Sequence, residues 1–312
     1  MTDTATQVSR REAWLMAARP HTLPAAAAPV VVGTGLAVHE GVFAALPALA
    51  AFVGAALIQI GTNFANDYYD AVKGVDTDDR EGFTRVTQSG LIPPDEVKRA
   101  TYATFGLAVL VGVYLVAVGG VPILVVGLAS VVSGFAYAGG PFPLGSHGLG
   151  DLFVFVFFGV VAVMGTFYVQ AASLVAGVPL GTPEGTVTWT GFLTSLPVAA
   201  ISTNILVVNN VRDLETDREA GKKTLAVLVG YRASRAEYVG MVALAYLVPV
   251  YFWIGGAFGP GVLLPLLTLP YAALVTRTVL TDSSGEALNP ALSQTGKLLA
   301  AHSALFALGM VV

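Results

Sequence analysis

The chain has 312 residues, of which 55% are hydrophobic and 12% are charged, and its formal net charge is −4. Its mean hydropathy of +0.72 excludes a water-soluble globular protein, because too little polar surface remains to cover a core of this size. The sequence contains no cysteine, which excludes disulfides, thiolate catalysis, iron–sulfur clusters and cysteine-ligated zinc. We therefore expect an integral membrane protein.

Beyond residue 20, near-continuous apolar stretches have the length of about 20 residues that an α-helix needs to cross a bilayer. We expect an all-α integral membrane bundle of about nine transmembrane helices, in one transmembrane domain that covers residues 1–312. Residues 1–20 have no uninterrupted apolar run and are expected to form a cytoplasmic lead-in rather than a signal peptide. The expected helices are 22–40, 44–66, 100–119, 121–139, 151–176, 189–209, 235–256, 260–281 and 292–312.

The basic residues lie mainly in three segments. The lead-in contains three of the 16 Lys and Arg residues, residues 67–99 contain five, and residues 210–235 contain six. Membrane proteins keep Lys and Arg on the cytoplasmic side, and strict alternation of nine spans places all three segments there. We therefore expect a multi-pass protein of the cell membrane with a cytoplasmic N-terminus and an outer C-terminus.

Polar residues gather at the end of the second expected helix, in the sequence NFANDYYDAVKGVDTDDR. Asn63, Asp67 and Asp70 are spaced i, i+4 and i+7, and Asn66 precedes Asp70 by four residues. On a continuing helix these side chains project from one side. Asp76 follows in the expected loop, so this helix end is predicted to carry a cluster of carboxylates.

A second polar concentration, NNVRDLETDREAGKKT, ends the sixth expected helix. Asn209, Asp213 and Asp217 are spaced i, i+4 and i+8, which predicts one helical face, and Lys222 and Lys223 follow in the loop. The two motifs resemble each other, and we expect both on the cytoplasmic side.

Two carboxylate clusters that face each other repel unless cations lie between them. Oxygen ligands favour hard cations, and Mg²⁺ keeps coordination positions open for substrate phosphates. A diphosphate also needs direct cationic partners. The candidates beside the carboxylates are Arg80, Arg85, Arg212, Lys222 and Lys223. The two motifs therefore predict a magnesium-dependent site for a phosphate ligand, with the active site facing the cytoplasm.

At these motifs the sequence resembles the UbiA superfamily of intramembrane prenyltransferases, whose first motif reads N-D-x-x-D-x-x-x-D and whose second reads D-x-x-x-D. The matching residues are Asn66, Asp67 and Asp70 in the first motif and Asp213 and Asp217 in the second. The family's last acid in the first motif falls at Gly74, and Asp76 lies two residues later.

This spacing, together with long stretches elsewhere, is similar to the 1,4-dihydroxy-2-naphthoate polyprenyltransferases (MenA-type). The stretches include ARPHTLPAAAAPVVVG, TRVTQSGLIPP and YAGGPFPLGSHGLGDLFVFVFFG. The resemblance implies transfer of a polyprenyl group from polyprenyl diphosphate to 1,4-dihydroxy-2-naphthoate, with loss of diphosphate and CO₂, to give demethylmenaquinone. In the implied mechanism, Mg²⁺ held by both motifs removes diphosphate, and the allylic cation alkylates the ring.

Residue roles follow from the spacing and the resemblance together. Tyr137 precedes a Gly-Gly-Pro break and resembles a functional tyrosine of the family, so its ring face is a candidate to stabilise the cation. The expected catalytic residues are Asp67, Asp70, Asp213, Asp217 and Tyr137; the expected metal ligands are Asp67, Asp70, Asp76, Asp213 and Asp217; the expected substrate-binding residues are Asn63, Asn66, Arg80, Arg85, Asn209, Arg212, Lys222 and Lys223.

Four further polar residues have less specific interpretations. Gln170 and Asn204 lie within expected spans, where hydrogen bonds to neighbouring helices are the more frequent role. His147 and Asp151 lie in an expected cytoplasmic loop near the site, and we interpret them as solvated loop residues rather than acceptor contacts.

Other functions stay open at this point. A UbiA-type enzyme could use another acceptor, such as hydroxybenzoate or a glycerol-phosphate ether lipid. A secondary transporter would place its acids near the bilayer midplane rather than at one face. A CDP-alcohol phosphotransferase would carry one compact acidic motif instead of two distant ones. We expect the lipid bilayer as surroundings, no nucleic acid and no obligate protein partner.

Overall fold

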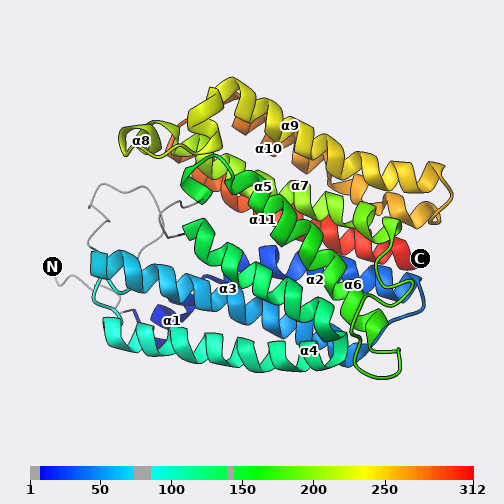
Figure 1. Ribbon diagram of the computed structural model, residues 1–312. Coiled ribbons are helices and arrows are strands. Elements are labelled where there is room, and N and C mark those ends of the chain that lie inside the picture. Colours follow the sequence, from blue (N-terminus) through cyan, green and yellow to red (C-terminus); the bar gives the residue numbers. More distant parts are fainter. Residues whose placement is uncertain (1–7, 74–85, 139–143) are drawn as a thin grey trace.

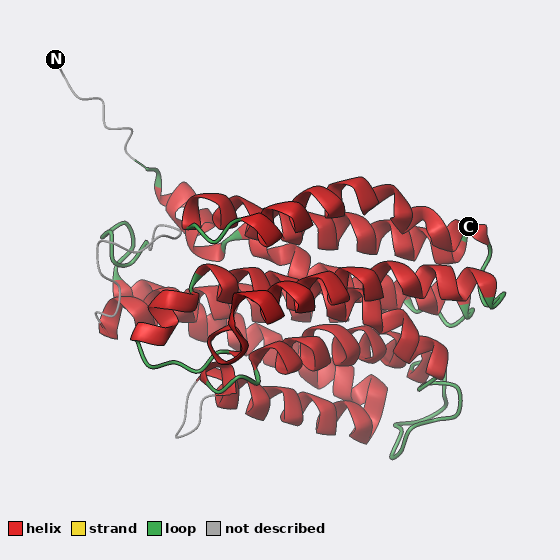
Figure 2. Cartoon of the chain, turned by 90° about the horizontal axis from the view of Figure 1, so that it is seen from above, coloured by secondary structure: helices red, strands yellow, loops and turns green. Residues whose placement is uncertain are grey.

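The structure is a computed structural model that describes residues 8–73, 86–138 and 144–312. In these ranges the regular elements are all helices (Figures 1 and 2), as the hydropathy pattern predicts. The elements are α1 Arg10–Ala18, η1 Pro20–Thr22, α2 Leu23–His39, α3 Ala45–Lys73, α4 Pro94–Ala138, η2 Leu144–Ser146, α5 Gly150–Val154, the π-helix η3 Phe155–Val161, α6 Ala162–Ala172, α7 Trp189–Arg212, α8 Leu214–Glu219, α9 Leu225–Ile254, η4 Pro260–Thr268, α10 Leu269–Thr281 and α11 Gly285–Val311.

The long helices run along one common direction and form an elongated bundle (Figure 1). Its largest buried apolar cluster joins α2, α6, α7, α9 and α11, through side chains such as Val32, Phe167, Val198 and Phe306. By contrast, apolar side chains such as Leu110 and Val132 of α4 are 67% exposed. Exposed apolar side chains on a tight interior are the expected arrangement of a helical bundle in lipid.

Glycine residues permit two close backbone approaches that shape this bundle. Gly120 interrupts α4 with φ 68° and ψ −155°, and a Cβ there would lie 1.8 Å from the carbonyl oxygen of Pro179. The interruption separates the two expected helices 100–119 and 121–139, which follow one another within α4. At Gly159 of η3, a Cβ would lie 2.1 Å from the Cβ of Ala199 in α7. This contact presses the α5–η3 segment against α7, where the second acidic motif begins.

The chain is a multi-pass membrane protein. Six helical segments of the described residues are long and apolar enough to cross a membrane, and a bent pair formed by α1 and α2 would make a seventh. Each of the nine expected segments coincides with helix over most of its length, so the sequence located the helices well. α9 begins at Leu225, earlier than the expected start at residue 235, and Gly230 (φ 79°, ψ 171°) interrupts it with a kink, so that a short helical segment precedes the expected span.

Candidate active site

The two acidic motifs lie at the same end of the bundle, although they are far apart in the sequence. In Figure 1 the C-terminal end of α3 and the short helix α8 are both at the left end of the molecule. The first motif is the last part of α3, and the second begins in the last turn of α7 and continues through α8. Both motifs therefore lie at one end of the bundle, as we predicted.

α3 continues to Lys73, so the helical spacing predicted for the first motif is correct. Its two inner polar residues, however, hold neighbouring segments. Asn63 is buried, and its Nδ2 donates to the carbonyl oxygen of Ala18 and to Oγ1 of Thr22, at 2.9 Å each. The segment that leads from α1 into α2 is thereby fixed to α3.

Asp67 is 1% exposed and binds the segment that precedes α4. Its Oδ1 accepts from the backbone N–H of Val86 at 3.2 Å, and its Oδ2 accepts from the N–H of Thr87 at 3.0 Å and from the Thr87 hydroxyl. Three hydrogen bonds satisfy this buried carboxylate without a cation. Its role as a ligand remains a prediction, and its observed contacts are those of an anchor.

Asn66 and Asp70 are the other two polar residues of this motif within α3. Asn66 is exposed, and Asp70 follows one helical turn later in α3. Residues at i and i+4 lie above one another on one helical face. Asn63, Asn66, Asp67 and Asp70 therefore lie along one broad side of α3, as their spacing predicted.

The second motif corrects one expectation. Asn209, Asp213 and Asp217 do not share one continuous helical face, because α7 ends at Arg212 and Asp213 links it to α8 with φ −92° and ψ 7°. The chain bends at Asp213 itself. Sequence spacing could not show this, because no glycine or proline marks the bend.

Arg212 organises the second motif. Its Nε and Nη2 donate to the two carboxylate oxygens of Asp213, both at 2.7 Å, which is a bidentate ion pair. Nη2 also donates to Oδ1 of Asn209 at 2.8 Å, and Nη1 donates to Oδ1 of Asn289 in α11 at 2.7 Å. The Asn209 Nδ2 donates to Asp213 at 3.3 Å. Asn209, Arg212 and Asp213 therefore act as one fixed unit.

The lysines that follow have separate contacts. Lys222 Nζ donates to Oδ1 of Asp217 at 2.7 Å, and Asp217 is 7% exposed. The backbone N–H of Lys223 donates to the carbonyl oxygen of Ser146 at 3.0 Å, while its side chain is exposed. In this motif Arg212 is thus paired with Asp213, and Lys222 is paired with Asp217.

Several predicted site residues lie outside the part of the chain that the structure describes. They are Asp76, Arg80 and Arg85, together with the side chains of Asp70 and Tyr137.

The donor set fits a hard cation in its chemistry. Asp213, whose side chain is 32% exposed, and the nearby amide groups supply oxygen ligands. Among residues 8–73, 86–138 and 144–312, no group of three or more His, Asp or Glu side chains is arranged to hold a metal.

Sequence reasoning missed three contributors to this region. Asn289 lies far along the chain in α11 and carried no signal, and Thr87 lies in the quoted stretch TRVTQSGLIPP but was given no role of its own. Asp151 was interpreted as a solvated loop residue, which is wrong: it lies in α5 and is 4% exposed, with Nδ2 of Asn210 3.5 Å from its Oδ2.

Two polar residues within the bundle have the role that we expected. Gln170 Nε2 donates to Oγ1 of Thr34 in α2 at 3.3 Å, and Asn204 Nδ2 donates to the carbonyl oxygen of Tyr238 in α9 at 3.0 Å. Both hydrogen bonds join neighbouring helices, so the prediction of interhelical contacts is confirmed.

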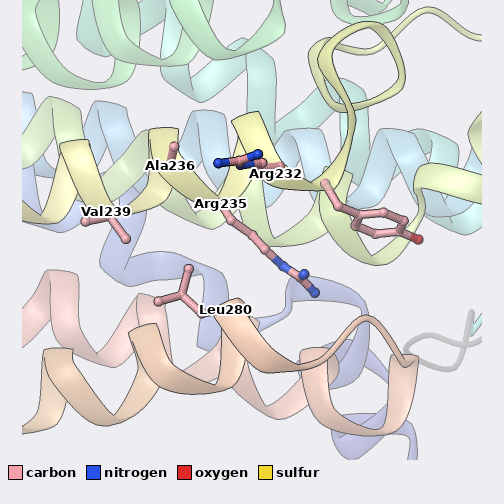
Figure 3. Close-up of a pocket in the computed structure, with 6 residues that line it drawn as sticks. Arg232, Arg235, Ala236, Val239 and Leu280 are labelled. Carbon is pink, nitrogen blue, oxygen red and sulfur yellow. The ribbon is translucent and has the colours of Figure 1, made fainter.

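A groove on the side of the bundle is lined by α9 and α10 and contains none of the predicted site residues (Figure 3). Arg232, Arg235 and Val239 lie on one wall, and Leu280 lies on the other. Arg235 donates to the carbonyl oxygens of Val279 and Asp282, at 2.9 and 2.7 Å, and so closes the C-terminal end of α10. The acidic motifs lie outside this groove.

The family model of the UbiA prenyltransferase family matches residues 26–300, which include both motifs. The chain belongs to the UbiA prenyltransferase family. Among curated UbiA relatives, it is 37% identical to a 1,4-dihydroxy-2-naphthoate octaprenyltransferase of Escherichia coli (strain K12), over 98% of this chain and 97% of that protein. It is also 37% identical to the protein of the same name from Mycobacterium tuberculosis, over 91% of each.

Solved UbiA structures share the fold. The apo structure of a UbiA homologue from Aeropyrum pernix superposes with a TM-score of 0.67 at 16% identity, over 90% of this chain and 96% of that chain. A UbiA homologue from Archaeoglobus fulgidus, bound to DMAPP and Mg²⁺, gives 0.57 at 17% identity, over 94% of this chain and 98% of that chain.

Proposed function

We propose that this UbiA family protein transfers a polyprenyl group from polyprenyl diphosphate to 1,4-dihydroxy-2-naphthoate, with loss of diphosphate and CO₂, to give demethylmenaquinone. The observation that carries the proposal is the unit formed by Asn209, Arg212 and Asp213 at the bundle end where α3 also presents Asn66. The two octaprenyltransferases that are 37% identical over most of both chains support the acceptor.

The chain's own residues bind and hold the charged substrate end. Arg212 keeps Asp213 in one orientation through two hydrogen bonds, and Lys222 does the same for Asp217 with one. We assign the metal to Asp70, Asp76, Asp213 and Asp217, with Asp67 as a further candidate. When bound, Mg²⁺ supplies positive charge that stabilises the departing diphosphate.

The exposed residues would contact the substrates. Lys223 and Asn66 are exposed, and with Arg80 and Arg85 they are the proposed direct partners of the diphosphate. The isoprenoid tail lies along the apolar bundle, which excludes water from the reacting carbon. Tyr137 is the proposed aromatic neighbour of the allylic cation.

The proposed topology has nine spans and an active site at the cytoplasmic face of the cell membrane. Six helical segments of the described residues are long and apolar enough to cross a membrane. Three more spans make nine. Gly120 divides α4 into two spans instead of one, the bent α1–α2 pair is counted as one span, and α11 is counted as another. The gathering of Lys and Arg beside the two motifs supports the cytoplasmic assignment.

The test is an acceptor panel with the purified protein, polyprenyl diphosphate and Mg²⁺. The acceptors are 1,4-dihydroxy-2-naphthoate, 4-hydroxybenzoate and a glycerol-phosphate ether lipid, each with and without a chelator. The proposal predicts a prenylated naphthalene product that disappears with the chelator. Preference for another acceptor would overturn the acceptor assignment, and no product with any of them would overturn the enzyme.

A further inference from the structure

Asp151 is a buried carboxyl group that lacks the partners such a group requires. It is 4% exposed, and its Oδ1 has no hydrogen-bond partner in the described part of the chain. Its Oδ2 lies 3.5 Å from Nδ2 of Asn210, at the limit of a hydrogen bond. A buried polar atom of this kind loses its hydration and gains no hydrogen bond in return. Its burial lowers the free energy of unfolding unless a further group binds there.

The position of Asp151 is fixed by its surroundings. The preceding loop is held by the hydrogen bond from Lys223 N–H to the Ser146 carbonyl oxygen. The following π-helix approaches α7 closely at Gly159. Asp151 is therefore placed by rigid elements rather than by a loose loop, as a binding residue needs to be.

Asp151 lies beside the second acidic motif but on another side of α7. Asn209 and Asn210 are consecutive, so their side chains leave the helix about 100° apart. Asn209 binds Arg212 and Asp213, whereas Asn210 faces Asp151. The last turn of α7 thus presents one amide to the proposed diphosphate site and one to α5.

The charge around Asp151 selects the kind of ligand. Glu237 of α9, a second and partly buried acid, lies near enough to Asp151 to interact with it electrostatically. No group of three or more His, Asp or Glu side chains that could hold a metal occurs in the described residues, so a cation site is not indicated here. An anion would be repelled, whereas a neutral hydroxyl group can donate a hydrogen bond to Asp151.

We propose that Asp151, supported by Asn210, binds a ring hydroxyl of the aromatic acceptor. This inference rests on the proposed function and deepens it. In 1,4-dihydroxy-2-naphthoate the 1-hydroxyl lies next to the carboxylate and can bond to it internally, which leaves the 4-hydroxyl as the free donor. We place the 4-hydroxyl of the acceptor against Asp151, with the acceptor carboxylate directed away from Asp151 and Glu237.

The test compares Asp151→Asn with wild type in steady-state kinetics. We expect the KM for dihydroxynaphthoate to rise about 10- to 100-fold, because a hydrogen bond to a charged group contributes about 1.5–3 kcal/mol. The KM for polyprenyl diphosphate should change less than about threefold. Asn210→Ala should raise the acceptor KM by a smaller factor. Asp282→Asn, at the same end of the bundle but outside the site, is the matched control and should leave both KM values unchanged.

A second measurement tests the hydroxyl itself. The inhibition constant of 1-hydroxy-2-naphthoate, which lacks the 4-hydroxyl, should be the same for wild type and Asp151→Asn. An unchanged acceptor KM would overturn the proposal and leave only bound water at Asp151. An equal rise of both KM values, or an equal loss of affinity for the 4-deoxy compound, would overturn it as well. If wild type prenylates none of the acceptors, the proposed function itself has failed.

Discussion

At the residue scale, the contacts of the first motif show which of its polar side chains anchor neighbouring segments. Asn63 and Asp67 are buried and hold the α1–α2 entry and the segment before α4. Asn66 is exposed, and Asp70 follows it by one turn. Sequence spacing grouped all four, because i+3, i+4 and i+7 positions share one broad side of a helix. Only the contacts of each side chain separate anchors from candidate ligands.

Thr87→Val tests the anchoring role of Asp67. The hydroxyl of Thr87 donates to a carboxylate that is 1% exposed, so its loss leaves a buried charge less well satisfied. We expect a destabilisation of about 1.5–3 kcal/mol, measured as a lower midpoint of thermal unfolding in detergent. Thr87→Ser keeps the hydroxyl and should unfold near wild type. Equal midpoints for the valine variant and wild type would contradict the role.

Asp213→Asn tests the central acid of the second motif. The substitution keeps the size of the side chain but removes the charge that Arg212 binds and that we assign to the metal. We expect kcat to fall by about 10²–10³ or more while the protein stays folded, although the weakened pair with Arg212 lowers the unfolding midpoint somewhat. Glu215→Gln in the adjoining helix α8, which alters an exposed pair with Arg218, should keep its activity. Near-normal turnover of Asp213→Asn would refute the assignment.

At the element scale, the hydropathy pattern located the helices, but close approaches and bends depended on tertiary contacts. Apolar runs predicted each helix, and the break within α4 coincides with the expected boundary at residue 120. The bend at Asp213 and the π-helix at Phe155–Val161 had no local signal, because their residues are compatible with a regular α-helix. Asp151 was interpreted as a loop residue because it stands at the start of the expected helix 151–176, whereas the structure places it in the first turn of α5.

A pair of glycine substitutions tests the contact between η3 and α7. A Cβ at Gly159 would lie 2.1 Å from the Cβ of Ala199, whereas a Cβ at Gly165 in α6 would meet nothing within 4 Å. We expect Gly159→Ala to destabilise the protein by about 1–3 kcal/mol through overpacking. Gly165→Ala should be neutral or stabilising, since alanine favours helix. The comparison is made by thermal unfolding, and an equal effect of both changes would contradict the close approach.

At the scale of the whole molecule, composition alone indicated a membrane bundle, and two repeated polar motifs indicated its functional end. The structure brings both motifs to that end, as the charge distribution predicted (Figure 1). The contacts between helices that complete the site, such as Arg212 with Asn289, were not predictable, because they join residues without a shared motif.

The orientation in the membrane can be measured directly, because the chain contains no cysteine. Single cysteines are introduced at Glu219, beside the second motif, and at Thr182, in the loop between α6 and α7. In intact cells, a membrane-impermeant maleimide should label Thr182→Cys and reach Glu219→Cys only after permeabilisation. The reverse pattern would place the active site on the outer face.

The most direct test of the account is the release of CO₂ from carboxyl-labelled 1,4-dihydroxy-2-naphthoate by the purified protein with polyprenyl diphosphate and Mg²⁺. The account predicts one CO₂ and one diphosphate for each prenylated ring, with both lost in Asp213→Asn and in the presence of a chelator. Turnover without CO₂ release, or undiminished turnover without divalent metal, would contradict it.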